Sequence, residues 1–261
     1  MTAGPSEAFH PGNGRLPVPP ADMKPAPVSL PAWTRWGRYD APAGTYPTAK
    51  RFMDLALTLL ALPLWGPLLL LGALLVRLRL GSPVLFAQER IGLGSKPFRL
   101  QKLRSMSAAR GPDGTLLPDA ERLGPFGRWL RSSSLDELPG LLSVLRGHLS
   151  LVGPRPLVPH YLPLYSPEQA RRHDLPGGIT GWAQVNGRNT VDWPERFAMD
   201  VWYTRNASLG LDLWILFLTV GKVLRRSGIE SPGHATMPPF SGNPDAGPGA
   251  HPGNPSPHQF S

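Results

Sequence analysis

The sequence predicts an α-rich mixed α+β fold, in which a re-entrant, proline-broken membrane helix near the N-terminus precedes a small cytosolic domain with interfacial helices. Three observations lead to this prediction. Residues 55–76 contain no charged residue, residues 83–88 form a short strand pattern, and residues 134–146 and 211–226 carry apolar side chains at helical spacing. The 261 residues are enough for one domain with a sizeable core and two tails.

The composition excludes several classes of protein. Hydrophobic residues make up 41% and charged residues 17% of the chain, so it is neither disordered throughout nor a polytopic membrane protein. Lys and Arg outnumber Asp and Glu by 27 to 18, and this formal charge of +9 indicates an anionic partner. The absence of Cys excludes disulfides and a thiol nucleophile, and the seven scattered His argue against a zinc enzyme.

Both ends of the chain are rich in proline. Residues 1–48 contain ten Pro and residues 231–261 contain eight, which together are 18 of the 33 in the chain. Such segments lack the apolar surface needed to offset the entropy of ordering, so both are predicted to be disordered tails. Within the first tail, residues 31–39 alternate Trp with Arg, a weak indication of contact with a membrane surface.

Residues 49–80 are predicted to enter the membrane, because about 20 apolar residues are needed to span the bilayer core. The segment lies too far from the N-terminus to be a signal peptide. Pro63, Gly66 and Pro67 interrupt it, and a break is expected at Gly66–Pro67. Basic residues lie at both ends, which favours a hairpin that enters and leaves on the cytoplasmic face; a Pro-kinked transmembrane helix is the alternative.

Residues 81–230 are expected to form the cytosolic domain. After the strand at 83–88, residues 107–120 are expected to form a loop. Residues 134–146 are predicted to form a helix with one leucine-rich face. Residues 211–226 are predicted to form a second helix, either lying at the membrane interface or packed in the domain core.

Two adjacent carboxylates, Asp136 and Glu137, begin the first of these helices. Ser134 and Glu137 match a capping box, which needs no function. Arg128, Arg131 and the electropositive helix N-terminus favour an ionised Asp136, as a nucleophile toward phosphorus requires. A neighbouring carboxylate is suited to Mg²⁺, which prefers one or two protein carboxylates with water and substrate phosphates.

Two further segments have residues suited to phosphate and nucleotide binding. Arg155 stands between two prolines, whose rigid backbone favours aiming the guanidinium at a phosphate; the alternative is a turn with a solvated Arg. Residues 176–188 form a glycine-rich stretch in which Trp182, Gln184 and Arg188 suit a base, a sugar and a phosphate. This stretch is neither a Walker loop nor a GxGxxG motif, and the alternative is a hairpin in the core.

Basic residues are concentrated between residues 50 and 110, opposed only by Asp54 and Glu89. Next to an apolar segment, such a cluster suits anionic lipid and phosphate better than nucleic acid, for which no binding motif is present. The cluster consists of Lys50, Arg51, Arg77, Arg79, Arg90, Lys96, Arg99, Lys102, Arg104 and Arg110.

Six blocks in fixed order, between Lys50 and Gly233, resemble the bacterial sugar transferase family. These are the monotopic polyprenyl-phosphate phosphoglycosyl transferases, and the likeness is to their small single-domain members. The blocks are Lys50-Arg-Phe-Met-Asp54, Phe86-Ala-Gln-Glu-Arg-Ile-Gly92, Lys102-Leu-Arg-Ser-Met106, Leu130-Arg-Ser-Ser-Ser-Leu-Asp-Glu-Leu-Pro139, Leu149-Ser-Leu-Val-Gly-Pro-Arg-Pro156 and Gly178-Ile-Thr-Gly-Trp-Ala-Gln-Val-Asn-Gly-Arg188.

The resemblance implies an enzyme that transfers a sugar phosphate from a UDP-sugar to undecaprenyl phosphate at the cytoplasmic face of the inner membrane. Asp136 would attack the β-phosphate, expel UMP and carry an aspartyl phosphosugar, and Glu137 would bind Mg²⁺. The residues expected to bind phosphate or substrate are Lys102, Arg104, Arg131, Arg155, Trp182, Gln184 and Arg188. The family's proline-broken re-entrant helix matches Gly66–Pro67.

Three positions depart from the family pattern: Gly140, Ser143 and His148 replace the more usual Gln, Asn and acidic residue. These departures bear on which UDP-sugar is used more than on the type of reaction. The pathway (capsule, exopolysaccharide or protein glycan) is left open. The alternative function is a non-catalytic membrane adaptor with a basic cytosolic domain.

Overall fold

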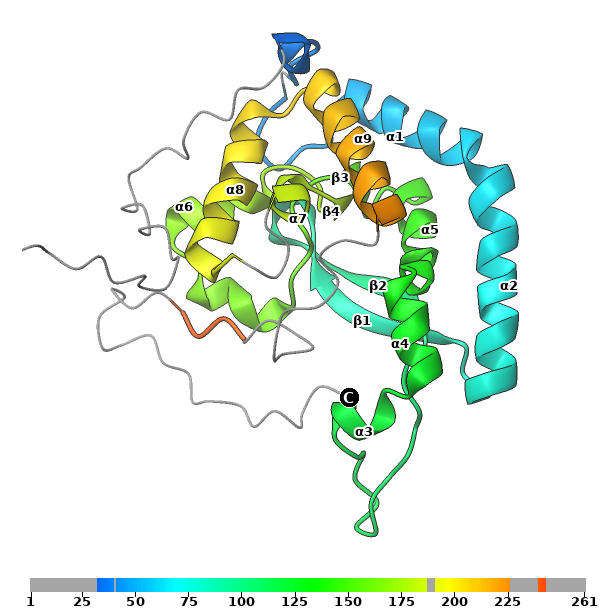
Figure 1. Ribbon diagram of the computed structural model, residues 1–261. Helices are drawn as coiled ribbons and strands as arrows, with labels where there is room; N and C mark the ends of the chain where they lie inside the picture. The colour runs from blue at the N-terminus through cyan, green and yellow to red at the C-terminus, as the bar shows by residue number, and fades with distance from the viewer. Residues whose placement is uncertain (1–31, 40, 187–190, 226–238, 243–261) are drawn as a thin grey trace, which may run out of the picture.

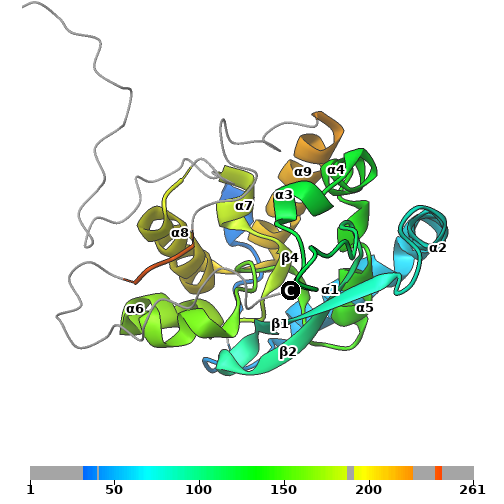
Figure 2. The same cartoon turned by 90° about the horizontal axis from the view of Figure 1, so that it is seen from below.

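The computed structural model describes residues 32–39, 41–186, 191–225 and 239–242. Within these ranges, helices surround two small β-sheets (Figure 1). Two long N-terminal helices lie at one edge of the molecule, and α6 (Pro167–Ala170) and α8 (Trp193–Asn206) lie at the opposite edge (Figure 2). The mixed, helix-rich fold class predicted from the sequence is confirmed.

The predicted membrane segment forms two helices, α1 (Thr48–Leu60) and α2 (Leu62–Leu80), which meet at Ala61. The expected break at Gly66–Pro67 is therefore wrong, because both residues lie inside α2. Pro63 precedes Gly66 and Pro67, and it lacks the N–H that would continue the hydrogen bonds of α1. A proline nevertheless fits the first turn of a new helix, and Pro63 lies in the first turn of α2. The indole N–H of Trp65 donates to the carbonyl of Thr58 across the bend, at 2.9 Å.

One side of α2 packs on the domain and the other is open. Trp65, Gly72 and Val76 are buried, and a Cβ on Gly72 would lie 2.8 Å from Leu103 Cδ1. In the described part of the chain, α2 is the helix long and apolar enough to cross a membrane. Its exposed side chains include Leu62, Leu64, Leu68, Leu70, Leu71, Leu74 and Leu78.

The polar residues of α1 attach that helix to the domain. Lys50 is fully buried and pairs with Asp212 at 2.7 Å. Asp54 accepts hydrogen bonds from the Ser150 hydroxyl at 2.7 Å and the Leu151 N–H at 3.0 Å. Arg51 donates to two carbonyls at the end of a neighbouring helix. Lys50 and Arg51 are therefore held by protein groups, which corrects their expected use as a lipid-facing basic flank.

The two sheets are short. Strands β1 (Leu85–Ile91) and β2 (Pro97–Leu103) form an antiparallel hairpin, so the predicted strand begins two residues later than 83 and extends beyond 88. Strands β3 (Ser150–Val152) and β4 (Gly178–Thr180) pair in parallel. Only glycine fits at Gly178, because a Cβ there would lie 2.1 Å from a backbone nitrogen.

The region predicted as one helix from 134 to 146 is divided. Helix α4 (Pro125–Ser132) precedes a 3-10 turn, η3 (Leu135–Glu137), and helix α5 (Pro139–Leu145) follows it. Ser134 has φ 58°, a left-handed conformation in which its hydroxyl caps no helix N–H, so the capping box does not form. The chain reversal at Ser134 instead leaves both carboxylates at the junction of two helices.

The main core lies under the C-terminal helices. Helix α9 (Leu209–Arg225) packs with α7 (Trp182–Asn186) and α8 around β3, burying Val152, Tyr203, Leu211 and Ile215. The opposite side of α9 exposes apolar residues, including Phe217. The core alternative is confirmed for one face of α9, and its position at the membrane interface stays a prediction. The remaining described elements are η2 (Leu93–Ser95), α3 (Asp119–Arg122), η4 (Pro159–Leu164) and η5 (Arg171–His173).

Parts of both predicted tails are ordered. Residues Ala32–Arg35 form η1, where Trp33 packs edge-on against Trp214 at a centroid distance of 5.7 Å. Near the other end of the chain, the Phe240 side chain is buried. The prediction of disorder is therefore wrong for residues 32–39 and 239–242, where aromatic side chains provide apolar surface; residues 1–31 and 243–261 lie outside the described part of the chain.

Candidate active site

The two adjacent carboxylates meet cationic side chains from distant parts of the chain. Glu137 Oε1 accepts hydrogen bonds from Lys102 Nζ at 2.7 Å and from Arg155 Nη2 at 2.6 Å. Lys102 lies on β2 and Arg155 follows β3, so two distant segments converge on η3. The structure thus brings together Asp136, Glu137, Lys102 and Arg155 as the sequence predicted.

A pocket opens beside Glu137. Its wall combines cationic side chains with backbone and apolar surface from β1, β2, α5 and β4. It is lined by Arg90, Leu100, Gln101, Lys102, Glu137, Gly140, Leu149, Arg155, Pro156, Gly178 and Ile179. Such a lining suits an anionic ligand that also carries an apolar or sugar portion.

The two carboxylates differ in charge state. Burial opposes ionisation of Glu137, but the charges of Arg155 and Lys102 together outweigh it and hold the pKa well below its usual range. Burial and the neighbouring Glu137 charge raise the pKa of Asp136 to about 6, against the opposing effects of Lys102, Arg131 and Arg155. Arg131 lowers the pKa of Asp136, as expected, but burial and the adjacent Glu137 carboxylate outweigh the cations, so the net shift is upward.

The Asp136 carboxylate is buried and differs from Glu137 in having no cationic hydrogen-bond donor among the described residues. Its side chain is only 7% exposed, and no hydrogen bond reaches its carboxylate from the residues that the structure describes. A carboxylate that no donor occupies retains its lone pairs for a reacting phosphorus.

The other predicted arginines differ in their positions. Arg131 donates to the Ser105 hydroxyl at 2.9 Å and is close enough to Asp136 to act on its pKa. Arg128 is turned away and donates to the Leu123 carbonyl at 2.8 Å. Arg104 binds the carbonyls of Leu80 and Ser82 at the end of α2, which corrects its expected role in the pocket.

The glycine-rich stretch is not a hairpin over its described length, because β4 leads directly into α7; its residues Gly178 and Ile179 line the pocket. Trp182 is 4% exposed and packs against Trp202 at a centroid distance of 5.0 Å, so it belongs to the core and does not face a base. Gln184 donates to the Ile179 carbonyl at 3.0 Å and so supports the pocket wall. Arg188 lies outside the described residues.

Arg90 belongs to the pocket, although the sequence reasoning placed it only in the general basic cluster. It donates to Gln88 Oε1 at 2.6 Å and to the Pro156 carbonyl at 3.2 Å. Burial and the charge of Arg155 lower its pKa to about 10, which leaves it cationic at neutral pH. No local pattern set Arg90 apart from the other members of the basic cluster.

A magnesium ion would depend on few protein ligands. Among the described residues there is no group of three or more His, Cys, Asp or Glu side chains placed to hold a metal. Both cationic partners of Glu137 bind Oε1, and no described donor reaches Oε2. One such oxygen beside Asp136 fits Mg²⁺, whose remaining ligands are commonly water and substrate phosphates.

Comparison with known proteins assigns the chain to a family. The family model described as bacterial sugar transferase matches residues 45–226, which include the whole site and both N-terminal helices. The chain belongs to the bacterial sugar transferase family. The resemblance inferred from the six sequence blocks is confirmed, and so is the prediction of an enzyme.

The sugar transferase match extends to individual proteins. The chain is 52% identical over 196 residues to a Bacillus subtilis (strain 168) protein named uncharacterized sugar transferase EpsL, covering 75% of this chain and 97% of that protein. It is 43% identical over 185 residues to the UDP-glucose:undecaprenyl-phosphate glucose-1-phosphate transferase of Caulobacter vibrioides (strain ATCC 19089 / CIP 103742 / CB 15), covering 67% of this chain and 69% of that enzyme. A Klebsiella pneumoniae enzyme of the same name is 40% identical over 195 residues, covering 70% of this chain and 42% of that enzyme.

Proposed function

We propose that this sugar transferase moves a sugar-1-phosphate from a UDP-sugar to undecaprenyl phosphate, with Asp136 as the nucleophile. The observation that carries the proposal is a carboxylate, Asp136, to which no described residue donates a hydrogen bond, next to a carboxylate held by two cations. The names of the Caulobacter and Klebsiella relatives support the two substrates.

The proposed reaction has two displacements at one phosphorus. In the first, an oxygen of ionised Asp136 bonds to the β-phosphorus of the UDP-sugar, and the phosphoanhydride bond breaks to release UMP. In the second, an oxygen of undecaprenyl phosphate attacks the same phosphorus and the bond to Asp136 breaks. The product is a diphosphate-linked sugar lipid, and the carboxylate is regenerated.

The surrounding residues stabilise charge on the phosphates. Arg155 and Lys102 each donate one hydrogen bond to Glu137 Oε1, which holds both side chains in place. Their remaining N–H groups would donate to substrate phosphate oxygens. Arg90, from the other side of the pocket, adds a third cation. When bound, Mg²⁺ would be held by Glu137 and would neutralise developing charge on the transferred group.

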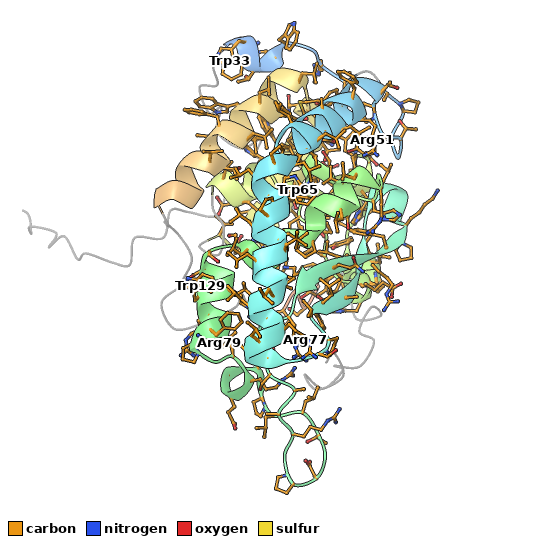
Figure 3. All side chains as sticks on the ribbon, turned by 90° about the vertical axis from the view of Figure 1, so that its right-hand side faces the viewer. Trp33, Arg51, Trp65, Arg77, Arg79 and Trp129 are labelled. Atoms are coloured by element: carbon orange, nitrogen blue, oxygen red, sulfur yellow. The ribbon has the colours of Figure 1, made fainter. Side chains whose placement is uncertain are left out.

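The packing of the N-terminal helices supports entry and exit on one side of the membrane. Gly72 in the middle of α2 meets Leu103 of the domain, whereas a spanning helix would carry its middle away from the domain. The leucines of α2 would face the acyl chains of one leaflet, with the domain at the cytoplasmic surface. Figure 3 shows α2 across the face turned to the viewer, with Trp129 of α4 beside it and Arg77 and Arg79 at its end.

The topology is testable by labelling. The chain has no cysteine, so single cysteines introduced at residues 46 and 82 are unambiguous probes. Both should react with an impermeant thiol reagent only after the cytoplasmic side is opened. Reaction of either one from the periplasm would contradict the proposed topology.

The reaction is testable with purified protein in detergent. UMP release should require a UDP-sugar, and a panel of UDP-sugars should identify the substrate. Asp136→Asn should abolish UMP release. Arg128→Gln should retain it, because Arg128 lies nearby in the sequence but binds the Leu123 carbonyl. A protein that releases no UMP with any UDP-sugar would favour the alternative of a membrane adaptor.

A further inference from the structure

An aromatic cage holds a short segment from near the C-terminus. The cage is formed by Tyr161, Tyr165, Trp193 and Phe197, and Phe240 inserts between them with 6% of its surface exposed. The Phe240 ring centroid lies 5.0 Å from that of Phe197 and 5.7 Å from that of Trp193. Several of these ring pairs meet edge to face, an arrangement that favours specific aromatic contact.

The segment binds as a short peptide would. The backbone N–H of Phe240 donates to the Tyr161 hydroxyl at 3.1 Å, while the residues on either side, Pro239 and Ser241, are exposed. Within the described residues, the segment therefore presents one buried side chain and one main-chain hydrogen bond to the cage. Figures 1 and 2 both show this orange-red segment beside α8.

The cage is connected to the active site through Arg172. The Arg172 guanidinium lies over the rings of Tyr165 at 5.8 Å and Phe197 at 5.5 Å. The same guanidinium donates to the backbone carbonyl of Arg155 at 2.8 Å and pairs with Asp200 at 2.6 Å. Arg155 in turn holds Glu137, so the rings that enclose Phe240 also fix the backbone of an active-site cation.

We propose that the aromatic cage is a peptide-binding site for the chain's own segment Pro239–Gly242, and that its occupation positions Arg155. The ligand is a proline-aromatic peptide, chemically distinct from the nucleotide and lipid substrates. The segment lies beyond residues 45–226 that match the family model. The binding part stands by itself, whereas the positioning of Arg155 for phosphate rests on the proposed function.

The binding part is tested with a fluorescent peptide of residues 233–243. Full-length protein carrying Phe240→Ala should bind this peptide saturably, whereas wild type and Ser241→Ala should bind it at least tenfold more weakly, because their own segment occupies the cage. A peptide with alanine in place of its phenylalanine should not bind. Adding Tyr161→Phe should weaken binding about fivefold, the effect of one lost hydrogen bond. Equal binding to wild type and Phe240→Ala, or none to either, would overturn the proposal.

The positioning part is tested by kinetics. Phe240→Ala should raise KM for the UDP-sugar several-fold with a smaller change in kcat, and the peptide added in trans should restore KM, whereas the alanine peptide should not. Ser241→Ala should match wild type. If the peptide binds but KM is unaltered by Phe240→Ala, the link to Arg155 is wrong. If wild type itself releases no UMP, the proposed function fails while the binding experiment still decides the role of the cage.

Hydrogen exchange of the Phe240 amide tests the docking of the segment without removing the Phe240 side chain. Tyr161→Phe in an otherwise wild-type chain keeps every ring and removes only the hydroxyl that accepts from Phe240. The Phe240 amide should then exchange about fivefold faster, while the amides of β1 and β2 are unaffected. An unchanged Phe240 exchange rate would contradict the docking described here.

Discussion

The pH dependence of the first chemical step follows from the environment of Asp136. Its carboxyl is neutral at low pH and must ionise to attack phosphorus, and its pKa of about 6 sets where that happens. The rate of adduct formation should therefore rise with pH and level off near pH 7. About one tenth of the protein is ionised one unit below the pKa, so the rate at pH 5 should be about tenfold below the plateau. Glu137, with its pKa held well below the usual range, stays ionised throughout.

Arg131→Gln tests this reasoning. Arg131 is one of the cations that oppose the raised pKa of Asp136, so its loss should move the rising limb of the profile to higher pH. Arg128→Gln on the same helix is the matched control, because Arg128 binds the Leu123 carbonyl and should leave the limb in place. The pH midpoint of the rising limb is read independently of the plateau rate. The plateau rate also falls if Arg131 binds phosphate.

The assay is rapid-quench measurement of the phosphosugar adduct without undecaprenyl phosphate, whose own phosphate titrates near the same pH. A wild-type rate that is flat from pH 5 to pH 8 would refute the assignment of the limb to Asp136. A limb that Arg131→Gln leaves unmoved, or moves to lower pH, would refute the electrostatic account.

Three further substitutions test the packing that holds the site. Lys50→Met leaves the buried Asp212 carboxylate without its cation and should lower the free energy of unfolding by about 3–5 kcal/mol. Adding Asp212→Asn should recover part of this loss. An effect below about 1 kcal/mol in denaturant titration would contradict this. Gly127→Ala should destabilise clearly, because a Cβ would lie 1.9 Å from the Ser105 carbonyl oxygen, whereas Gly124→Ala meets nothing within 4 Å and should be nearly neutral in thermal melts. Trp65→Phe removes the hydrogen bond across the helix bend and should cost about 1 kcal/mol; an unchanged midpoint would show that the bond is not needed.

Local sequence patterns predicted the carboxylate pair, the apolar helix and the helix over 211–226 because each depends on neighbouring residues. They did not predict which cations reach Glu137, since Lys102 is 35 residues away along the chain. The family blocks gave Lys102 and Arg155 as phosphate-binding residues, but they did not predict that both pair with Glu137. In the same way, Lys50 appeared to be a membrane flank because its partner, Asp212, lies 162 residues away.

The wrong predictions share a physical cause, which is the dependence of a residue's role on packing from another segment. Trp182 follows several glycines and suggested a loop, but it packs against Trp202 of α8. Phe240 lies in a proline-rich stretch and suggested disorder, but a cage from η4 and α8 encloses it. The helix break was assigned to Gly66–Pro67, whereas Pro63 had already ended the hydrogen bonding of α1.

The most direct test of the account is to identify the residue that carries the covalent phosphosugar. Protein incubated with its UDP-sugar and Mg²⁺, without lipid phosphate, is digested at low temperature and the peptide around η3 is sequenced by mass spectrometry. The account predicts a sugar-phosphate mass on Asp136, which disappears when undecaprenyl phosphate is added. A modified Glu137, or UMP released with no modified peptide, would contradict it.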